Sequence, residues 1–317
     1  MLSADPLISV VILSWNRKAD LSTTLQAVAR QSYRGGETIV VDNGSTDGSP
    51  EMVRTLFPEV RLITLPQNAG IEGLNVGLRA ARGEIAVLLD DDSYPVAGTF
   101  ERLVMAFQHD SRIGIAAGRI VGPLDAVEPE RSDRQQPEAE RDVPTFVGCG
   151  VGLRRAALER AGLFDSTFFL YGNELDLAAR VMDAGFAVRY IPGAVFVHAV
   201  SSANRTSFRR EYYCMRNLLW VIWKYFPLRE AVPLSLRVTA LGVGYRLSRR
   251  DLRRVWGVLR GVGGALAGRR SPLDRRVVSR ETRQRLLTYI DEWYPPPWAW
   301  LRGRLRGSAQ RANYGQH

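Results

Sequence analysis

The sequence predicts an α/β fold with a mostly parallel, Rossmann-like central sheet and a helical C-terminal extension. Short apolar runs alternate with segments of helical spacing, polar residues follow the runs, and the last third of the chain is helical and basic. Apolar strands that alternate with helices are typical of a parallel sheet covered by helices on both faces.

The first part of the chain contains four apolar runs that we interpret as buried strands. They are Ile8–Leu13, Thr38–Val41, Val60–Thr64 and Ile85–Leu89. The apolar spacing between these runs predicts helices over residues 21–31, 51–56 and 73–81. Polar residues follow the strands at Ser14, Asp42 and Asp90, and ligands of open α/β sheets bind beyond the carboxyl ends of the strands.

The middle of the chain is less regular. Residues 123–142 are polar, acidic and contain prolines, which predicts a surface loop or a hairpin. The pattern then predicts a strand over 146–154, helices over 156–161 and 174–184, and strands over 188–190 and 194–198. Helical, arginine-rich sequence begins at about residue 209.

Composition limits the class of protein. The chain has 317 residues, of which 45% are hydrophobic and 24% charged, so disorder throughout is excluded. Its 2 cysteines have no short paired spacing, which indicates neither a disulfide framework nor a zinc site and fits a reducing compartment. No apolar run reaches the roughly 18 residues of a spanning helix, and no basic leader precedes the first strand. We therefore expect a cytoplasmic protein.

The net charge of +10 is unevenly distributed. Residues 1–208 carry 20 Lys and Arg against 26 Asp and Glu, whereas residues 209–317 carry 23 against 7. We therefore expect two domains, 1–208 and 209–317. A basic region suits a polyanionic partner, and no nucleic-acid-binding module is recognisable. Peripheral contact with the inner face of a membrane, a homodimer interface and a solvated helical extension remain open for the second domain.

Three consecutive carboxylates, Asp90, Asp91 and Asp92, end the fourth predicted strand. Adjacent carboxylates repel one another unless a cation neutralises them. Oxygen ligands of this kind suit Mg²⁺ or Mn²⁺. The alternative is a solvated acidic turn.

Two further segments place polar groups at the same predicted edge. Asp42 ends the second strand, where its carboxylate could accept a hydrogen bond from a nucleotide base, or could instead form an Asx turn. Asn68 and Gly70 precede a helix among small residues, which lets the backbone approach a phosphate or a sugar closely.

Glu174 and His198 are the remaining candidates for chemistry. Glu174 and Asp176 are two positions apart at a helix start, so we expect them to have different roles. One carboxylate would act at the site while the other caps the helix or complements its dipole. His198 ends a strand and could join the carboxylates around Mn²⁺, although a single histidine is often structural.

Taken in order, these segments resemble the family 2 glycosyltransferases with the GT-A fold, within their rhamnosyltransferase-like group. The resemblance extends from about Ile8 to Ser201. The residues that carry it are Ser9–Ile12, Asn16-Arg17, Val40–Gly48, Asn68–Gly70, Ala80–Gly83, Leu88–Asp92, Gly162–Asp165, Phe169–Leu177 and Pro192–His198.

The resemblance implies a GT-A catalytic domain over 1–208, with nucleotide-sugar binding in about 1–122 and the acceptor side in about 143–208. The implied reaction is inverting transfer from a dTDP- or UDP-sugar, such as dTDP-rhamnose, to a hydroxyl group. The acceptor would be a polysaccharide, a lipid-linked glycan or a natural product. The implied mechanism is metal-assisted direct displacement, with Mg²⁺ or Mn²⁺ as the cofactor.

The resemblance also implies roles for individual residues. Asp42 would face the base, and Asp90 and Asp92 match the first and third positions of the DXD motif. Asp92 and His198 would bind the metal, and Asp90 the ribose or the metal.

Glu174 matches the family's general base, with a departure: Asn173 stands where the family has Glu, and Glu174 where it has Asp. The donor-binding residues that remain are Asn16, Asn68, Gly70 and Asp91.

Two other functions would also use a metal or nucleotide site on an α/β sheet. A metal-dependent nucleotidyltransferase would carry a glycine-rich loop with a basic residue after the first strand, and Ser14–Arg17 lacks those glycines. A non-catalytic nucleotide- or carbohydrate-binding relic is disfavoured because Asp90, Asp92, Glu174 and His198 are all present.

Overall fold

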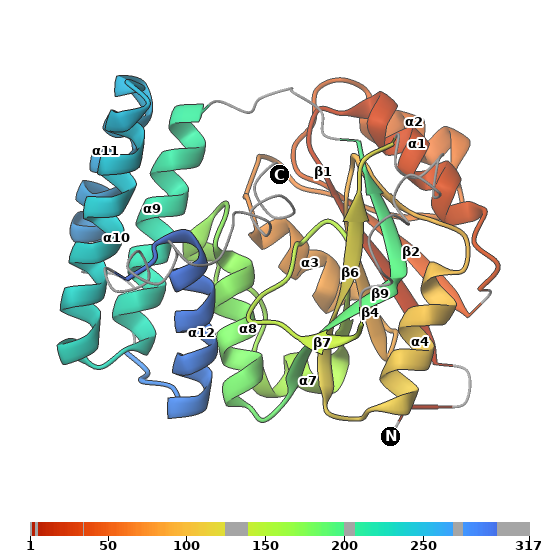
Figure 1. Cartoon of the computed structure of the whole chain (residues 1–317). Helices are drawn as coiled ribbons and strands as arrows, with labels where there is room; N and C mark the ends of the chain where they lie inside the picture. The colour runs from red at the N-terminus through yellow and green to blue at the C-terminus, as the bar shows by residue number, and fades with distance from the viewer. Residues whose placement is uncertain are drawn as a thin grey trace. The chain divides into compact units, whose positions relative to one another are not determined.

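Two compact units, Met1–Ser201 and Ser202–His317, make up the chain (Figure 1). The computed structural model describes residues 2–3, 6–33, 35–123, 139–199, 207–268 and 275–296. Most of the acidic segment 123–142, predicted to be a surface loop or a hairpin, lies outside these residues.

The first unit is built on a nine-stranded sheet with the order β3-β2-β1-β4-β8-β6-β9-β5, and β7 pairs with β9. The strands are β1 (Ile8–Ser14), β2 (Gly36–Asp42), β3 (Arg61–Thr64), β4 (Ile85–Asp90), β5 (Ser93–Pro95), β6 (Ile113–Val121), β7 (Arg141–Asp142), β8 (Val151–Arg154) and β9 (Ala187–His198).

The four strands predicted first form a parallel block. In it, β1 pairs with β2 and β4, and β2 pairs with β3, all in parallel. Beyond this block the sheet is mixed, because β8 lies antiparallel between β4 and β6. The parallel direction returns where β6 pairs with β9. The predicted α/β class with a mostly parallel sheet is confirmed, and the antiparallel β8 is the departure from a simple alternation.

The local pattern missed or misplaced several elements. It passed over β5, β6 and the helix between them, α4 (Thr99–His109). In β6, Gly and Ala residues separate the β-branched residues into short groups, so no continuous apolar run marks the strand. β9 runs unbroken through Pro192 and Gly193, where two strands were predicted, because a register shift in its pairing with β6 accommodates the interruption.

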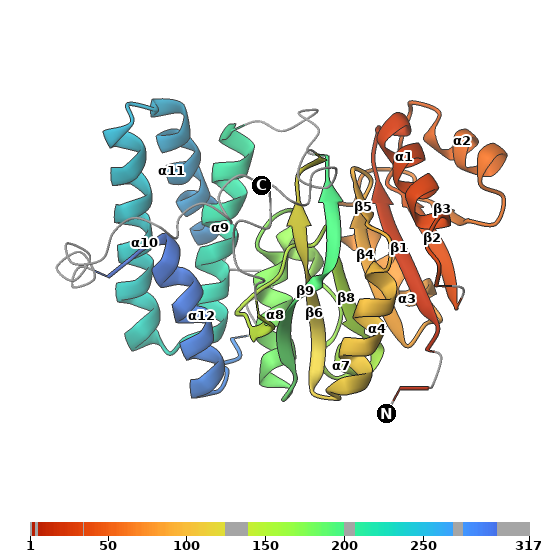
Figure 2. The ribbon, with the colours of Figure 1, turned by 45° about the vertical axis from the view of Figure 1, so that its right-hand side comes forward.

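Helices cover both faces of the sheet (Figure 2). One face carries α1 (Lys18–Ala29), α2 (Ser49–Leu56) and α4, whose apolar residues pack with Val10, Ile12 and Val87 in one core. The other face carries α3 (Glu72–Ala80), α7 (Arg155–Ala161) and α8 (Asn173–Asp183). Both faces of β1 are therefore buried, as its continuous apolar run predicted.

Glycines allow α3 to lie close to the sheet. A Cβ atom at Gly77 would come 2.4 Å from Val11 Cγ1 and 3.1 Å from Val41 Cγ2. A Cβ atom at Gly73 would come 2.4 Å from Leu13 Cδ1. This close approach places the loop before α3 beside the ends of β1 and β2.

The second unit is helical, as predicted. It comprises α9 (Ser207–Tyr225), α10 (Leu228–Ser248), α11 (Leu252–Ala267) and α12 (Arg280–Trp293). α9 and α11 pack through glycines, since a Cβ atom at Gly261 would lie 2.7 Å from the Tyr212 carbonyl oxygen. Inside the bundle, Arg246 pairs with Glu211. None of the described helices is long and apolar enough to cross a membrane.

The α3 packing predicts the effect of adding one methyl group. Gly77→Ala should lower the free energy of unfolding by about 1–3 kcal/mol, because the new Cβ overlaps side chains held in the sheet. The matched control is Gly263→Ala in α11, where a Cβ atom meets nothing within 4 Å. That change should be neutral or stabilise by up to about 1 kcal/mol through helix propensity. Chemical denaturation followed by circular dichroism measures both, and equal effects would contradict the packing argument.

Candidate active site

The parallel block brings three strand ends together. Ser14 lies beside Asp42 in the pairing of β1 with β2, and Leu13 lies beside Asp90 in the pairing of β1 with β4. Register alone therefore gathers the polar residues that follow these strands. The predicted shared edge is present in the structure.

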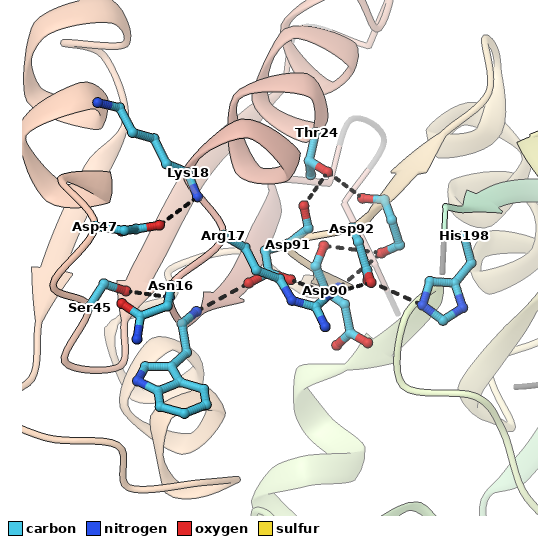
Figure 3. Close-up of polar contacts among 12 residues, drawn as sticks. Asn16, Arg17, Lys18, Thr24, Ser45, Asp47, Asp90, Asp91, Asp92 and His198 are labelled. Carbon is cyan, nitrogen blue, oxygen red and sulfur yellow. Dashed lines mark hydrogen bonds and ion pairs between the residues drawn. The ribbon is translucent and has the colours of Figure 1, made fainter. Parts of the chain in front are cut away.

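The acidic triplet is held by the loop after β1 (Figure 3). Arg17 forms an ion pair with Asp92 and lies 3.4 Å from Asp91 Oδ1. The Trp15 backbone N–H donates to Asp91 Oδ2 at 3.1 Å. The Thr24 hydroxyl donates to the main-chain oxygens of Asp91 and Ser93. Arg17 thus supplies part of the positive charge that three adjacent carboxylates require.

Burial reduces the negative charge of the triplet by favouring the protonated form of Asp91. Asp91 is 7% exposed, and burial raises the pKa of its carboxyl to about 7. Arg17 opposes this rise, while Asp90 and Asp92 add to it. The triplet is therefore not a solvated acidic turn, because Asp91 and Asp92 are buried and Asp90 is partly buried.

His198 reaches the triplet through the pairing of β5 with β9. Ser93 lies opposite His198 in this antiparallel pair, and the Ala199 N–H donates to the Asp92 carbonyl oxygen at 2.9 Å. His198 Nε2 lies 3.1 Å from Asp92 Oδ1. His198, the last residue of β9, is 4% exposed, so its imidazole is buried beside the triplet.

A group of side chains that could hold a metal ion lies beside the triplet. One donor atom each from Asp90, Cys149 and His198 lie within 4.8 Å of one another. Divalent ions bind side-chain donors at about 2.0–2.3 Å, so three donors this close can share one ion. The donor chemistry fits a divalent transition metal such as Mn²⁺. Asp92, predicted as a ligand with Asp90 and His198, stands behind His198 and beside Arg17.

Asp42 forms the predicted Asx turn with one carboxylate oxygen and leaves the other oxygen without a donor in the described part of the chain. It is 2% exposed, and its Oδ2 accepts the Ser45 N–H at 3.0 Å in an Asx-type turn. Its Oδ1 is buried and has no hydrogen-bond donor among the described residues. A buried carboxylate oxygen without a donor is costly, so this atom is suited to accept from a bound group.

Asn16 ties the loop after β1 to the loop after β2. Its side-chain oxygen accepts the Thr46 N–H at 2.8 Å, and its backbone N–H donates to Ser45 Oγ at 2.9 Å. Asn16 also adopts a positive φ of 54°. The sequence predicted that Asn16 binds the donor. In the structure its hydrogen bonds go to Ser45 and Thr46, which follow Asp42 in the chain.

A chain of amide hydrogen bonds links β2 to the loop before α8. Asn43 Nδ2 donates to Asn68 Oδ1, which also accepts the Gly70 N–H at 2.9 Å. Gly70 has a φ of +59°, and a Cβ atom there would lie 2.6 Å from the ring of Phe169. The Ile71 N–H donates to the Phe169 carbonyl oxygen at 3.0 Å. Asn68 and Gly70 therefore position a neighbouring loop through backbone contacts.

That neighbouring loop presents Glu174. Phe169 and Tyr171 both have a φ of 60°, and Gly172 a φ of 72°, immediately before α8 begins. Non-glycine residues in this region are strained, and such strain is concentrated at functional sites. Burial raises the pKa of Glu174 to about 7, and Asp90 adds to the rise. The Glu174 side chain lies against residue 148, where a Cβ atom would be 3.3 Å from Oε1.

Asp176 has a different role from Glu174, as their spacing predicted. Its side chain is fully buried and pairs with Arg180 at 2.8 Å. Arg180 in turn donates to the Ala161 carbonyl oxygen at 2.6 Å. Asp176 therefore ties α8 to the end of α7.

Sequence reasoning gave no role to Arg17, Cys149 or Phe169. Arg17 lies three residues after the end of β1, and this position after a strand end is the local signal that could have marked it. Cys149 stands between Gly148 and Gly150, and such flanking glycines indicate a close backbone approach. Phe169 has no local signal, because its contact with Gly70 depends on the fold.

Comparison with known proteins agrees with this architecture. Residues 9–162 match the family model "Glycosyl transferase family 2". The chain is 26% identical over 230 residues to an N-acetylglucosaminyl-diphospho-decaprenol L-rhamnosyltransferase of Mycobacterium tuberculosis, covering 60% of this chain and 75% of the relative. It is 27% identical over 212 residues to the glycosyltransferase AglE of Haloferax volcanii, covering 62% and 68%.

The chain belongs to the family 2 glycosyltransferases. It is accordingly a glycosyltransferase enzyme.

Solved glycosyltransferase structures share the fold. The mannosyltransferase PcManGT of Pyrobaculum calidifontis, in complex with GDP-Man and Mn²⁺, superposes with a TM-score of 0.57 at 22% identity, covering 95% of this chain and 84% of that one. Residues 1–349 of TarS of S. aureus superpose with a TM-score of 0.58 at 16% identity, covering 93% and 91%. The predicted GT-A fold is confirmed for this glycosyltransferase.

The raised pKa of Glu174 predicts a pH-dependent stability difference. Between 4.5 and about 7, the folded state keeps a proton that the unfolded chain releases, so this group makes folding less favourable as pH rises. Glu174→Gln cannot ionise, so the variant does not show this decrease in stability with rising pH. Relative to wild type, the variant should gain on the order of 1–3 kcal/mol in free energy of unfolding between about pH 4 and pH 8.

Denaturant titrations at the two pH values measure this difference. The matched control is Glu159→Gln, the same change at an exposed position of α7. A difference between wild type and Glu174→Gln that stays constant with pH would contradict the assignment.

Proposed function

We propose that this glycosyltransferase moves a sugar from a dTDP- or UDP-sugar to a hydroxyl group by metal-assisted direct displacement, with inversion at the anomeric carbon. One observation carries the proposal: three separate requirements of that reaction lie at one sheet edge. Asp42 offers a buried acceptor oxygen, Asp90 and His198 lie within metal-binding distance of each other, and Glu174 has a pKa raised to about 7.

In this mechanism the loops after β1, β2 and β4 hold the donor. Asp42 would accept an N–H of the pyrimidine base, and Asp90 and His198 would hold the divalent ion, with Mn²⁺ or Mg²⁺ as candidates. Asp92, expected from the sequence to be a third ligand, would instead orient the His198 imidazole. Arg17 forms an ion pair with Asp92 and fixes the direction of its carboxylate. A bound ion would neutralise the charge that develops on the diphosphate leaving group.

Glu174 would act as the general base. Its carboxylate removes the proton of the acceptor hydroxyl while the hydroxyl oxygen attacks the anomeric carbon. The bond from that carbon to the diphosphate breaks in the same step, so no enzyme-bound sugar forms and the configuration inverts. A base with a pKa near 7 suits this transfer at neutral pH. The strained loop before α8 presents Glu174 rigidly.

The names of relatives support a narrower choice of substrates. The mycobacterial relative is named for rhamnosyl transfer to N-acetylglucosaminyl-diphospho-decaprenol. We propose dTDP-rhamnose as the first donor to test and a lipid-linked glycan as the first acceptor, which would place the enzyme in cell-wall or polysaccharide synthesis. The family assignment favours this transferase over the nucleotidyltransferase and the non-catalytic relic.

Calorimetry tests the donor site. UDP and dTDP should bind wild type only with Mn²⁺ or Mg²⁺, and Asp90→Asn should lose the metal-dependent binding of both nucleotides and of inorganic pyrophosphate. Asp42→Asn should weaken UDP and dTDP binding by about tenfold to a hundredfold, because one charged hydrogen bond is lost. Pyrophosphate, which has no base, should bind Asp42→Asn as it binds wild type. Absence of nucleoside-diphosphate binding to folded wild type would overturn the proposal.

For the second unit we propose peripheral contact with an anionic membrane surface. α11 exposes Leu252, Trp256 and Leu259 at 70%, 56% and 45%, and their spacing places them on one face of the helix. Arg253 and Arg260 are exposed on the same helix. An apolar stripe beside arginines is typical of a helix that lies in a membrane interface. A lipid-linked acceptor would be reached from that surface.

Vesicle co-sedimentation tests this contact. Wild type should bind phosphatidylglycerol vesicles more tightly than phosphatidylcholine vesicles, and Trp256→Ala should weaken the binding roughly tenfold or more through lost apolar burial. Met105→Ala, which removes an exposed apolar side chain from the first unit, is the control. Equal binding of Trp256→Ala and wild type would contradict the stripe. Dimerisation without vesicle binding would assign the stripe to a second copy of the chain.

A further inference from the structure

Cys149 occupies an unusual position for a buried cysteine. The thiol is 2% exposed, and the chain's other cysteine, Cys214, belongs to the second unit. Neither cysteine forms a disulfide with another described residue. The Cys149 thiol lies beside the carboxylate of Asp90 and the imidazole of His198.

The backbone around Cys149 is packed tightly against β9. A Cβ atom at Gly150 would lie 2.7 Å from the Phe196 ring, so only glycine permits this approach. The Gly150 carbonyl oxygen accepts the Gly118 N–H at 3.0 Å. On the other side, Gly148 lies against the Glu174 side chain. The thiol therefore has a defined place between the metal-binding group and the proposed base.

Sγ of Cys149, a carboxylate oxygen of Asp90 and an imidazole nitrogen of His198 lie within 4.8 Å of one another. These donors come from three distant parts of the chain: the end of β4, the residues before β8 and the end of β9. Asp92 Oδ1 lies 3.1 Å from His198 Nε2, an arrangement in which a carboxylate orients a ligating imidazole.

We propose that Cys149 is a sulfur ligand of the divalent ion at this site, together with Asp90 and His198. The inference rests on the proposed function, which requires an ion here, and it narrows the choice of ion. When the sulfur binds, the S–H bond breaks, sulfur keeps the electron pair and donates it to the ion, and the proton leaves to solvent. Thiolate favours Mn²⁺, Co²⁺ or Zn²⁺ over Mg²⁺, which prefers oxygen ligands.

Co²⁺ is a direct probe of the sulfur ligand. Titration of the full chain with Co²⁺ should produce visible ligand-field bands together with a near-ultraviolet thiolate-to-cobalt charge-transfer band. Cys149→Ser should keep the ligand-field bands and lose the charge-transfer band. Cys214→Ser, the matched control, should keep both. Circular dichroism confirms that each variant is folded.

Competition between Mn²⁺ and Mg²⁺ gives a second measurement. Cys149→Ser should lower the preference for Mn²⁺ over Mg²⁺ by about tenfold or more, because a soft donor is replaced by a hard one. Ligand-field bands without a charge-transfer band in wild type, or a charge-transfer band that survives in Cys149→Ser, would overturn the sulfur ligand and leave the metal-dependent transferase intact. Absence of both bands in folded wild type would overturn the metal site itself, and the proposed mechanism with it.

Discussion

Carboxylates buried side by side at one sheet edge are the constraint on which the first unit depends. Asp42, Asp91 and Asp92 are nearly inaccessible to water, and Glu174 stands close to Asp90. Parallel register places these groups together, so their repulsion cannot be relieved by moving one strand. Arg17 offsets part of the charge, and the raised pKa values of Asp91 and Glu174 offset more by protonation. A bound cation would lower the remaining repulsion further.

Hydrogen bonds among the loops hold this edge in place. Asn16 joins the loops that follow β1 and β2, and Asn43 joins the second of these to Asn68 and Gly70. Gly70 then contacts Phe169 in the strained turn before Glu174. Strain of this type persists only where the surroundings determine the backbone, and these contacts supply that support. Glu174 and the loops that follow β1 and β2 are therefore connected by a continuous series of contacts.

Cys149 links the metal-binding group to the antiparallel part of the sheet. β8 is inserted between β4 and β6, and the residues before it place the thiol beside Asp90 and His198. The departure from a simple parallel fold thus brings a sulfur atom to an oxygen- and nitrogen-containing site. The basic second unit has its own core and its own exposed apolar stripe, which indicates a task separate from the chemistry.

The fold class, the parallel block and the candidate residues Asp42, Asp90, Asp92, Glu174 and His198 were accessible from the sequence. Apolar periodicity and the polar residue after each strand are local signals, so they can be read from the sequence without knowledge of the fold. The motif order also indicated the family. By contrast, β6 was missed because Gly and Ala separate its β-branched residues, and α4 was missed although its apolar residues have helical spacing.

Tertiary structure alone decided which side chains meet. The pairing of β5 with β9 brings His198 to Asp92, and the insertion of β8 brings Cys149 to Asp90. Arg17 and Phe169 acquired roles only through partners far away in the chain. Local sequence determines the type of each element, whereas strand order and register depend on the summed packing of the whole sheet. Contacts between distant residues therefore follow from the fold and not from spacing.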